Sequence, residues 1–301
     1  MIKNRSKRLS LQQGDRLFNI VNNTLLCVVF VIILYPLIYI VSASFSSSQA
    51  VTSGQVWLLP VKPTLVGYAT IFKDSAIVTG YLNTIYIVVV GTSVNIVLTV
   101  LAAYPLSVKN FYGKNFFMGI LAFTMLFNGG LVPTFLLINR LGLYNSFAAL
   151  ILPGAVGVYN VIVARTYFQS NIPAELFEAA NIDGCSDIKF MVKIVIPLSA
   201  PILAVLVMFY AVGHWNAYFN AMIYISDRHK YTLQIVLRNI LIANQTSDQM
   251  MTDADILMKQ QGLIDLLKYS LIVVSSLPML ILYPFIQKHF VKGIMIGALK
   301  G

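Results

Sequence analysis

The chain has 301 residues, of which 58% are hydrophobic and 11% are charged, and its mean hydropathy is +0.78. A soluble domain carries about 25% charged residues, so this composition excludes an ordinary soluble protein and indicates a membrane protein. The formal net charge is +10. Its one dense basic cluster lies near the N-terminus, where it predicts membrane orientation and not nucleic-acid binding. That cluster is Lys3, Arg5, Lys7 and Arg8.

The first predicted element is a transmembrane helix with an apolar core at residues 21–41, about the length that a bilayer requires. Residues 1–20 form a basic arm before it. The basic flank and the SASFSSS segment after the helix also resemble a secretory signal, but the apolar run is long and further spans follow. Residues 42–74 are polar and contain several glycines and prolines, which predicts an extracytoplasmic loop.

Residues 77–108 contain no charged residue and predict a second span. Small and amide-bearing residues within it favour close helix packing over contact with a substrate. These are Asn83, Thr92, Ser93, Asn95 and Thr99. A third span, residues 116–139, is interrupted by Asn128-Gly129-Gly130 and Pro133, which predicts a kink or a broken helix. The break lies either beside a wet pathway or near the membrane surface.

A fourth span is predicted at residues 147–167, with a flexible point at Pro153, Gly154 and Gly157. A charged hairpin, residues 171–195, follows. In it Asn171 is expected to cap a helix at residues 174–182, Gly184 to adopt the left-handed conformation after it, and Ser186 to cap a second helix. The spacing of Leu176, Phe177 and Ala180 predicts one apolar face on the first helix, and the small Ala179 and Ala180 let another backbone come close.

Residues 196–225 predict a fifth span whose second half is rich in aromatic rings and amides. Rings stack on the apolar faces of sugars and amides bond to their hydroxyls, so a substrate path is one interpretation. An aromatic belt at the outer interface, with ordinary packing, is the other. The substrate-path candidates are Tyr210, His214, Trp215, Asn216, Tyr218 and Asn220. We expect His214 to be a packed or snorkelling histidine and not a metal ligand or proton relay, because it has no Cys, Asp or Glu neighbour.

Residues 227–268 predict a long external loop with an amphipathic stretch at 231–241, and residues 269–286 predict a sixth span. Six spans place both termini on one side. With the N-terminus in the cytoplasm, 13 of the 21 lysines and arginines lie in inner segments, as the positive-inside rule requires. This orientation also places the charged hairpin in the cytoplasm. Cys27 and Cys185 fall in different segments, so no disulfide is expected.

Two kinds of motif are absent from the sequence, and their absence restricts the functions that we expect. The sequence contains no glycine-rich phosphate loop that ends in Lys and Ser or Thr, so we expect no ATP, no other cofactor and no metal bound by this chain, and no enzymatic activity of its own. The predicted spans also lack the central Asp, Glu, Lys or Arg on which proton-coupled carriers depend. A transporter whose energy source is a separate subunit fits both absences.

The hairpin carries a resemblance to a known family. Glu178-Ala179-Ala180, then Gly184, then Ile194-x-Ile196-Pro197 resembles the EAA loop of ABC-importer permeases, with Ile196 where a leucine is usual. The whole chain resembles the carbohydrate-importer permeases of the MalG-like type, nearest to the LplC and YtcP branch. The stretches that carry this resemblance are LYPLIYIVSASFS, GHWNAYFNAMIYI and YPFIQKHFVKGIMIGALKG.

This resemblance implies an all-α polytopic membrane protein with six transmembrane helices, the type I ABC importer permease fold, in which residues 21–301 form the permease domain. It implies a complex with a second homologous permease, two ATP-binding subunits that hold ATP and Mg, and an extracellular solute-binding protein that delivers a carbohydrate. Membrane lipid surrounds the complex, and no nucleic acid is involved. The expected ATPase-coupling residues are Glu175, Glu178, Ala179, Ala180, Asp183 and Gly184.

Alternatives remain open at this point. The cargo could be another polar solute, such as a peptide or an amino acid. It could also be a uronic-acid sugar, for which Arg228, Lys230, Arg238 or the partner permease would supply positive charge. From a different class, the chain could be a membrane scaffold without transport activity.

Overall fold

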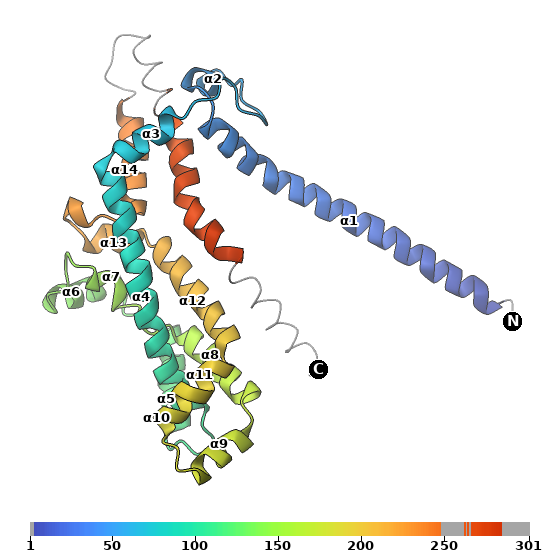
Figure 1. The fold of residues 1–301 in the computed structure, drawn as a ribbon, viewed down its shortest axis with the longest axis vertical. Helices are drawn as coiled ribbons and strands as arrows, with labels where there is room; N and C mark the ends of the chain where they lie inside the picture. Colours follow the sequence, from blue (N-terminus) through green and yellow to red (C-terminus); the bar gives the residue numbers. More distant parts are fainter. Residues whose placement is uncertain (1–2, 248–261, 263, 265, 285–301) are drawn as a thin grey trace. The chain divides into compact units, whose positions relative to one another are not determined.

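The computed structural model describes residues 3–247, 262, 264 and 266–284 (Figure 1). Every regular element within these residues is a helix, which confirms the all-α prediction. The chain divides into two compact units. One consists of Met1–Lys73 with Leu241–Ser275, and the other consists of Asp74–Ile240 with Ser276–Gly301.

The first unit begins with α1 (Lys3–Ser44), a helix that continues without interruption from the basic arm into the predicted first span. The short helices α2 (Ser48–Thr52) and α3 (Val66–Lys73) follow. The serines around the end of α1 are used internally, since the Ser42 hydroxyl donates to the Leu58 carbonyl at 2.6 Å. The serine-rich segment therefore fastens the end of α1 to the loop that follows it.

The second unit is arranged around α4 (Ser75–Ser107). Figure 1 shows α8 (Val158–Asn171) and α12 (Ala200–Trp215) beside it, and both contact it. Small polar residues of α4 lie at these contacts, which confirms the packing interpretation for Thr92, Asn95 and Thr99, all of them buried.

The third predicted span is broken at the place that the sequence indicated. α5 (Lys114–Leu126) and α6 (Leu131–Arg140) meet at 114°. Gly130, immediately before α6, has a φ of +85°, a conformation that residues with a side chain rarely adopt. The predicted fourth span is also interrupted, because α7 (Ala148–Ile151) ends well before α8 begins.

The fifth predicted span, residues 196–225, is made of several helices and not of one. That it crosses the membrane stays a prediction. α11 (Ile196–Leu198) and α12 belong to helical segments that meet at 83°, and α13 (Phe219–Tyr224) begins after a second break. The first break has a local cause. Pro201 has no N–H to bond to the carbonyl of Pro197 four residues earlier, and its ring crowds that carbonyl.

Within the part of the chain that the structure describes, three helices are long and apolar enough to cross a membrane: Phe18–Ser44, Ser75–Ser107 and Leu266–Pro284. The number rises to five if each of the two bent helix pairs counts as one span. That the chain crosses the membrane six times and that both of its termini are cytoplasmic stay predictions. The end of the sixth predicted span and the basic tail, residues 285–301, lie outside the described residues.

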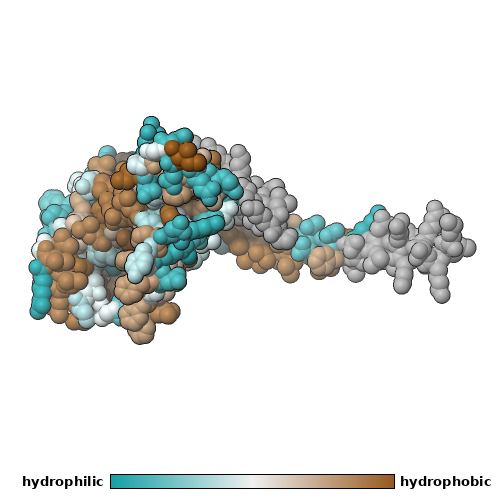
Figure 2. Space-filling view, turned by 90° about the horizontal axis from the view of Figure 1, so that it is seen from below, coloured by the Kyte–Doolittle hydropathy of each residue, from teal (hydrophilic) through white to brown (hydrophobic). Residues whose placement is uncertain are grey.

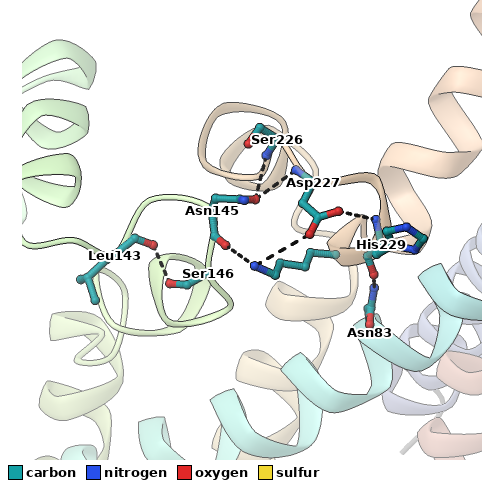
Figure 3. A network of polar contacts seen from close by, with 8 residues as sticks. Asn83, Leu143, Asn145, Ser146, Ser226, Asp227 and His229 are labelled. Atoms are coloured by element: carbon teal, nitrogen blue, oxygen red, sulfur yellow. Dashed lines mark hydrogen bonds and ion pairs between the residues drawn. The ribbon is translucent and has the colours of Figure 1, made fainter.

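The predicted external loop contains regular structure where it is described. A 3-10 turn, η2 (Arg228–Lys230), leads into α14 (Leu233–Ser247), so the amphipathic stretch lies largely in a helix. Figure 3 shows how Asn145, in the turn before α7, is tied to this segment. Its side-chain oxygen accepts from the Asp227 N–H at 3.0 Å, and its carbonyl accepts from Lys230 Nζ at 2.9 Å.

Candidate functional site

The charged hairpin has the predicted helix bounds. α9 spans Ala174–Ile182, and Gly184 follows it with a φ of +68°. The Cys185 N–H donates to the Ala180 carbonyl at 2.9 Å, so the left-handed glycine closes a Schellman-type end. The second helix, α10 (Asp187–Phe190), is capped by the Ser186 hydroxyl, as predicted.

The expected cap of the first helix was wrong. Asn171 is the last residue of α8, and its side-chain amide donates back to the Tyr167 carbonyl at 3.2 Å. Pro173 occupies the cap position of α9 and makes no side-chain hydrogen bond there. Asn171 is drawn into the preceding helix because Ile172 and Pro173 provide the break between the two.

The apolar face of the hairpin is turned toward its own unit. Phe177 and Phe190 pack edge to face, with ring centroids 5.4 Å apart, and Phe190 is only 3% exposed. Ala180 lies in the same buried cluster, together with Tyr104 of α4 and Phe168 of α8. The small side chain of Ala180 therefore packs the hairpin against α4 and α8. The coupling role of Ala180 stays a prediction.

The opposite side of the hairpin is exposed and combines carboxylates with apolar side chains. Ile182 is 87% exposed and Ile188 is 72% exposed, at the two sides of the Gly184 turn. Neither isoleucine was among the predicted coupling residues, although two isoleucines next to charged residues at a turn are visible in the sequence. The predicted coupling residues that are exposed are Glu175, Glu178, Ala179, Asp183 and Gly184.

A cavity of about 800 Å³ lies beside α9. The end of α4, the end of α8 and one side of α9 line it, and its charged lining residues are Lys109, Glu175 and Glu178. Figure 2 views the molecule from the end at which the hairpin lies and shows hydrophilic and hydrophobic surface mixed on that face. A surface of this kind suits a protein partner that supplies both apolar and basic groups.

The end of α4 next to the hairpin is fixed by α8. Arg165 Nε donates to the Leu106 carbonyl at 2.9 Å, and Gln169 Nε2 donates to the Ser107 carbonyl at 3.3 Å. These carbonyls belong to the last turn of α4, where a helix leaves its carbonyls unpaired and favours a positive charge. The end of α4 on which the hairpin packs is therefore held in place by α8.

The substrate-path candidates divide into buried and exposed residues. Tyr210 is 8% exposed, and its hydroxyl lies 2.7 Å from the Thr99 hydroxyl and accepts from the Gly157 N–H at 3.2 Å. Trp215 is 3% exposed and contacts Tyr81 edge to face. Both rings take part in helix packing, which agrees with the packing interpretation of this segment.

His214 is also a packing residue, as expected. Its Nε2 lies 2.7 Å from Oδ1 of Asn95, whose amide nitrogen donates to the carbonyls of Gly154 and Ala155 at 3.0 and 2.9 Å. These carbonyls lie in the break between α7 and α8, so Asn95 satisfies backbone groups that the missing helix leaves free. The ring fits because α4 has a glycine, Gly91, opposite it.

Of the remaining candidates, two lie at the surface and Tyr218 is half-buried. Asn216 and Asn220 are exposed, and the Asn216 amide donates to the Val212 carbonyl of its own helix end at 3.1 Å. The ring of Tyr218 lies under the guanidinium of Arg238, with 5.3 Å between Cζ and the ring centroid. This contact between α14 and the segment after α12 could not be read from the sequence.

A sequence profile of the binding-protein-dependent transport system inner membrane components matches residues 95–296, which is more than half of the chain. The chain belongs to this family. The matched region contains the hairpin, the cavity beside it and the aromatic segment after α12.

Individual members of the family match nearly the whole chain. The Bacillus subtilis polygalacturonan/rhamnogalacturonan transport system permease protein YtcP is 39% identical over 287 residues, covering 95% of this chain and 99% of that protein. The Bacillus subtilis protein LplC is 39% identical over 293 residues, covering 96% and 97%. A solved bacterial ABC transporter involved in the import of the acidic polysaccharide alginate is 37% identical with a TM-score of 0.84, covering 92% of this chain and 98% of that one.

Proposed function

We propose that this chain forms half of the translocation pathway of an ABC importer for a sugar or oligosaccharide. The names of its relatives support this cargo, since they include permeases for polygalacturonan and, at 28% identity, the arabinooligosaccharide permease AraQ of Halalkalibacterium halodurans. The family's own description implies a solute-binding protein outside the membrane. The cell membrane is the site of action, and the proposed orientation has both termini in the cytoplasm.

The proposed complex contains a second homologous permease and two ATP-binding subunits, which hold ATP and Mg and carry out the hydrolysis. The observation that carries the proposal is the two-sided hairpin. Phe190 and Ala180 hold it on its own unit, while Glu175, Glu178 and Ile182 are exposed and available to a cleft in an ATPase subunit.

In the proposed mechanism, closure of the ATPase subunits on ATP moves the hairpin, and the pathway changes from inward-facing to outward-facing. Reversing a two-state population from 1:99 to 99:1 requires about 5.5 kcal/mol of differential binding. The hairpin can transfer such a free energy only if it moves as a body with α4 and α8. Its buried aromatic contacts and the Arg165 bond at the end of α4 support that rigidity.

The proposal is tested with the purified complex in lipid vesicles, by uptake of labelled oligosaccharides in the presence of the binding protein and ATP. Gly184→Pro removes the left-handed conformation at φ +68°, and Glu178→Lys reverses a charge on the exposed side. We expect both variants to assemble in part and to lose substrate-stimulated transport. Glu178→Gln, which keeps the size of the side chain, should retain part of the uptake.

The amounts of the ATPase and of the second permease that purify with each variant distinguish failed coupling from failed assembly. Normal uptake by Gly184→Pro or by Glu178→Lys would contradict the coupling role of the hairpin. Failure of the unaltered chain to purify with an ATPase would favour a membrane scaffold.

A further inference from the structure

Two residues of α14 contact the end of α12 and the segment that follows it. Arg238 Cζ lies 5.3 Å from the centroid of the Tyr218 ring, and its Nη1 lies 3.4 Å from the Met222 sulfur. Gln234, one turn earlier on α14, donates from Nε2 to the Trp215 carbonyl at 3.3 Å. The position of the Arg238 side chain is therefore set by contacts, although the residue is exposed.

The charge of Arg238 has no carboxylate partner among the described residues. The ion pair within those residues joins Lys230 to Asp227, at 3.9 Å, and Lys230 also donates to the Asn145 carbonyl (Figure 3). Lys230 is thus used by the fold. Arg238 directs one N–H group at a sulfur atom, and a guanidinium has five such donors in a planar fork.

A guanidinium held over an aromatic ring is suited to bind a planar anion. The ring fixes the plane of the fork, so less rotational freedom is lost when two parallel hydrogen bonds form to a carboxylate. A saccharide that places a carboxylate on this fork comes next to Tyr218, one of the rings expected to stack on sugars. The Tyr218 ring itself is covered by the guanidinium and packs against a buried cluster, so the recognition that this site offers is that of charge.

We infer that Arg238 binds a carboxylate of the cargo and that the cargo is an acidic, uronate-containing oligosaccharide. This inference rests on the proposed function, because it assigns the substrate class of the same pathway. The solved relative imports an acidic polysaccharide and another relative is named for polygalacturonan, which agrees with this chemistry. Recognition by Arg238 is a property of this chain's own residues and is testable apart from those names.

The experiment compares two forms of one sugar in the reconstituted complex: labelled trigalacturonate and its methyl ester, in which the carboxylates are neutral. For Arg238→Gln we expect the initial uptake rate of the acid to fall about ten-fold or more, because a hydrogen bond to a charged group is lost. Uptake of the ester should change less than two-fold. The binding protein is the same in each assay, so a difference between variants arises in the permease.

Two further variants serve as controls. Arg238→Lys keeps the charge but loses the fork, and acid uptake should be intermediate. Arg228→Gln removes an exposed arginine that makes no ring contact within the described part of the chain, and it should leave both rates near those of the unaltered complex. Subunit composition and basal ATPase activity show that each variant is assembled.

Each other outcome counts against the inference. An equal loss of acid and ester uptake in Arg238→Gln would make Arg238 a structural clamp between α13 and α14. Unchanged acid uptake, or an equal effect of Arg228→Gln, would overturn specific recognition. An unaltered complex that imports the ester but not the acid would overturn the acidic cargo and leave the proposed importer standing, whereas one that imports no saccharide would refute the proposed function itself.

Discussion

At the scale of single residues, the approach of His214 to α4 depends on the absence of a side chain at Gly91. A Cβ atom placed there would lie 2.6 Å from Nε2 of the His214 ring. We expect Gly91→Leu to displace the ring and destabilise the protein by about 1–3 kcal/mol, as overpacked cores do. Thermal unfolding of the solubilised complex measures the effect.

Gly213 provides the matched control, because it lies next to His214 and a Cβ atom there would meet nothing within 4 Å. Gly213→Leu should unfold close to the unaltered protein. Equal destabilisation by the two substitutions would show that the space opposite the ring is not the cause.

Asn95 stabilises the break between α7 and α8 through its amide nitrogen. Asn95→Ala leaves the buried Ala155 carbonyl without this donor, and an unsatisfied buried group costs about 1–3 kcal/mol. Ser93→Ala removes an exposed hydroxyl that donates to the Val89 carbonyl of its own helix, so we expect a much smaller change in the unfolding temperature. Similar effects of both variants would contradict this role for Asn95.

The residues that were predicted correctly influence the backbone only a few positions away from them along the chain. Gly184 and Ser186 end and begin helices by local backbone chemistry, and both do so in the structure. Asn171 was assigned to the wrong helix because an asparagine near a helix boundary can bond in either direction. The pairing of Arg238 with Tyr218 depends on which helices meet, and no pattern along the chain contains that information.

At the scale of elements, the four residues of α10 include one side chain on the buried side of the hairpin and one on its exposed side. Phe190→Ala empties a buried position, and we expect a loss of stability of about 3–5 kcal/mol. Ile188→Ser changes a side chain that is 72% exposed, so stability should change by less than about 0.5 kcal/mol. Ile188→Ser should instead reduce the amount of ATPase subunit that purifies with the complex.

Unfolding and co-purification are measured on the same preparations. If Ile188→Ser destabilises the complex as strongly as Phe190→Ala, or leaves ATPase recovery unchanged, the exposed isoleucine is not part of the proposed docking surface.

Hydropathy predicted where the apolar segments lie, but it did not predict where their helices are interrupted. The long apolar helices α1 and α4 were predicted because a bilayer requires such lengths. The predicted fifth span is interrupted at Ser199 and again after Trp215, and hydropathy is insensitive to the missing N–H of Pro201 beside the first break. The direction of the hairpin's apolar face was also not predictable, because an apolar stripe does not reveal whether its own chain or a partner covers it.

At the scale of the whole molecule, the proposed orientation makes Cys185 accessible from the cytoplasm. Its side chain is partly exposed on the hairpin, whereas Cys27 lies in the first candidate span. In a Cys27→Ser background, a membrane-impermeant maleimide should label Cys185 in inverted vesicles and not in intact cells.

Ser226→Cys, placed in a Cys27→Ser, Cys185→Ser background, gives the converse control. Ser226 is exposed in the segment before η2, so the new thiol should react in intact cells. Labelling of Cys185 from outside would reverse the orientation and remove the hairpin from the ATPase side.

The uninterrupted course of α4 has a mechanical consequence. At one end, Asn83 donates to the His229 carbonyl at 2.8 Å and the Thr84 hydroxyl accepts from the Leu233 N–H at 2.9 Å; at the other, residues 100–106 support the hairpin. The chain's direct route from the hairpin into α12 is bent by 83°. A displacement of the hairpin would therefore be carried to η2 and the start of α14 along one continuous helix, and a displacement at η2 would be carried back along the same helix.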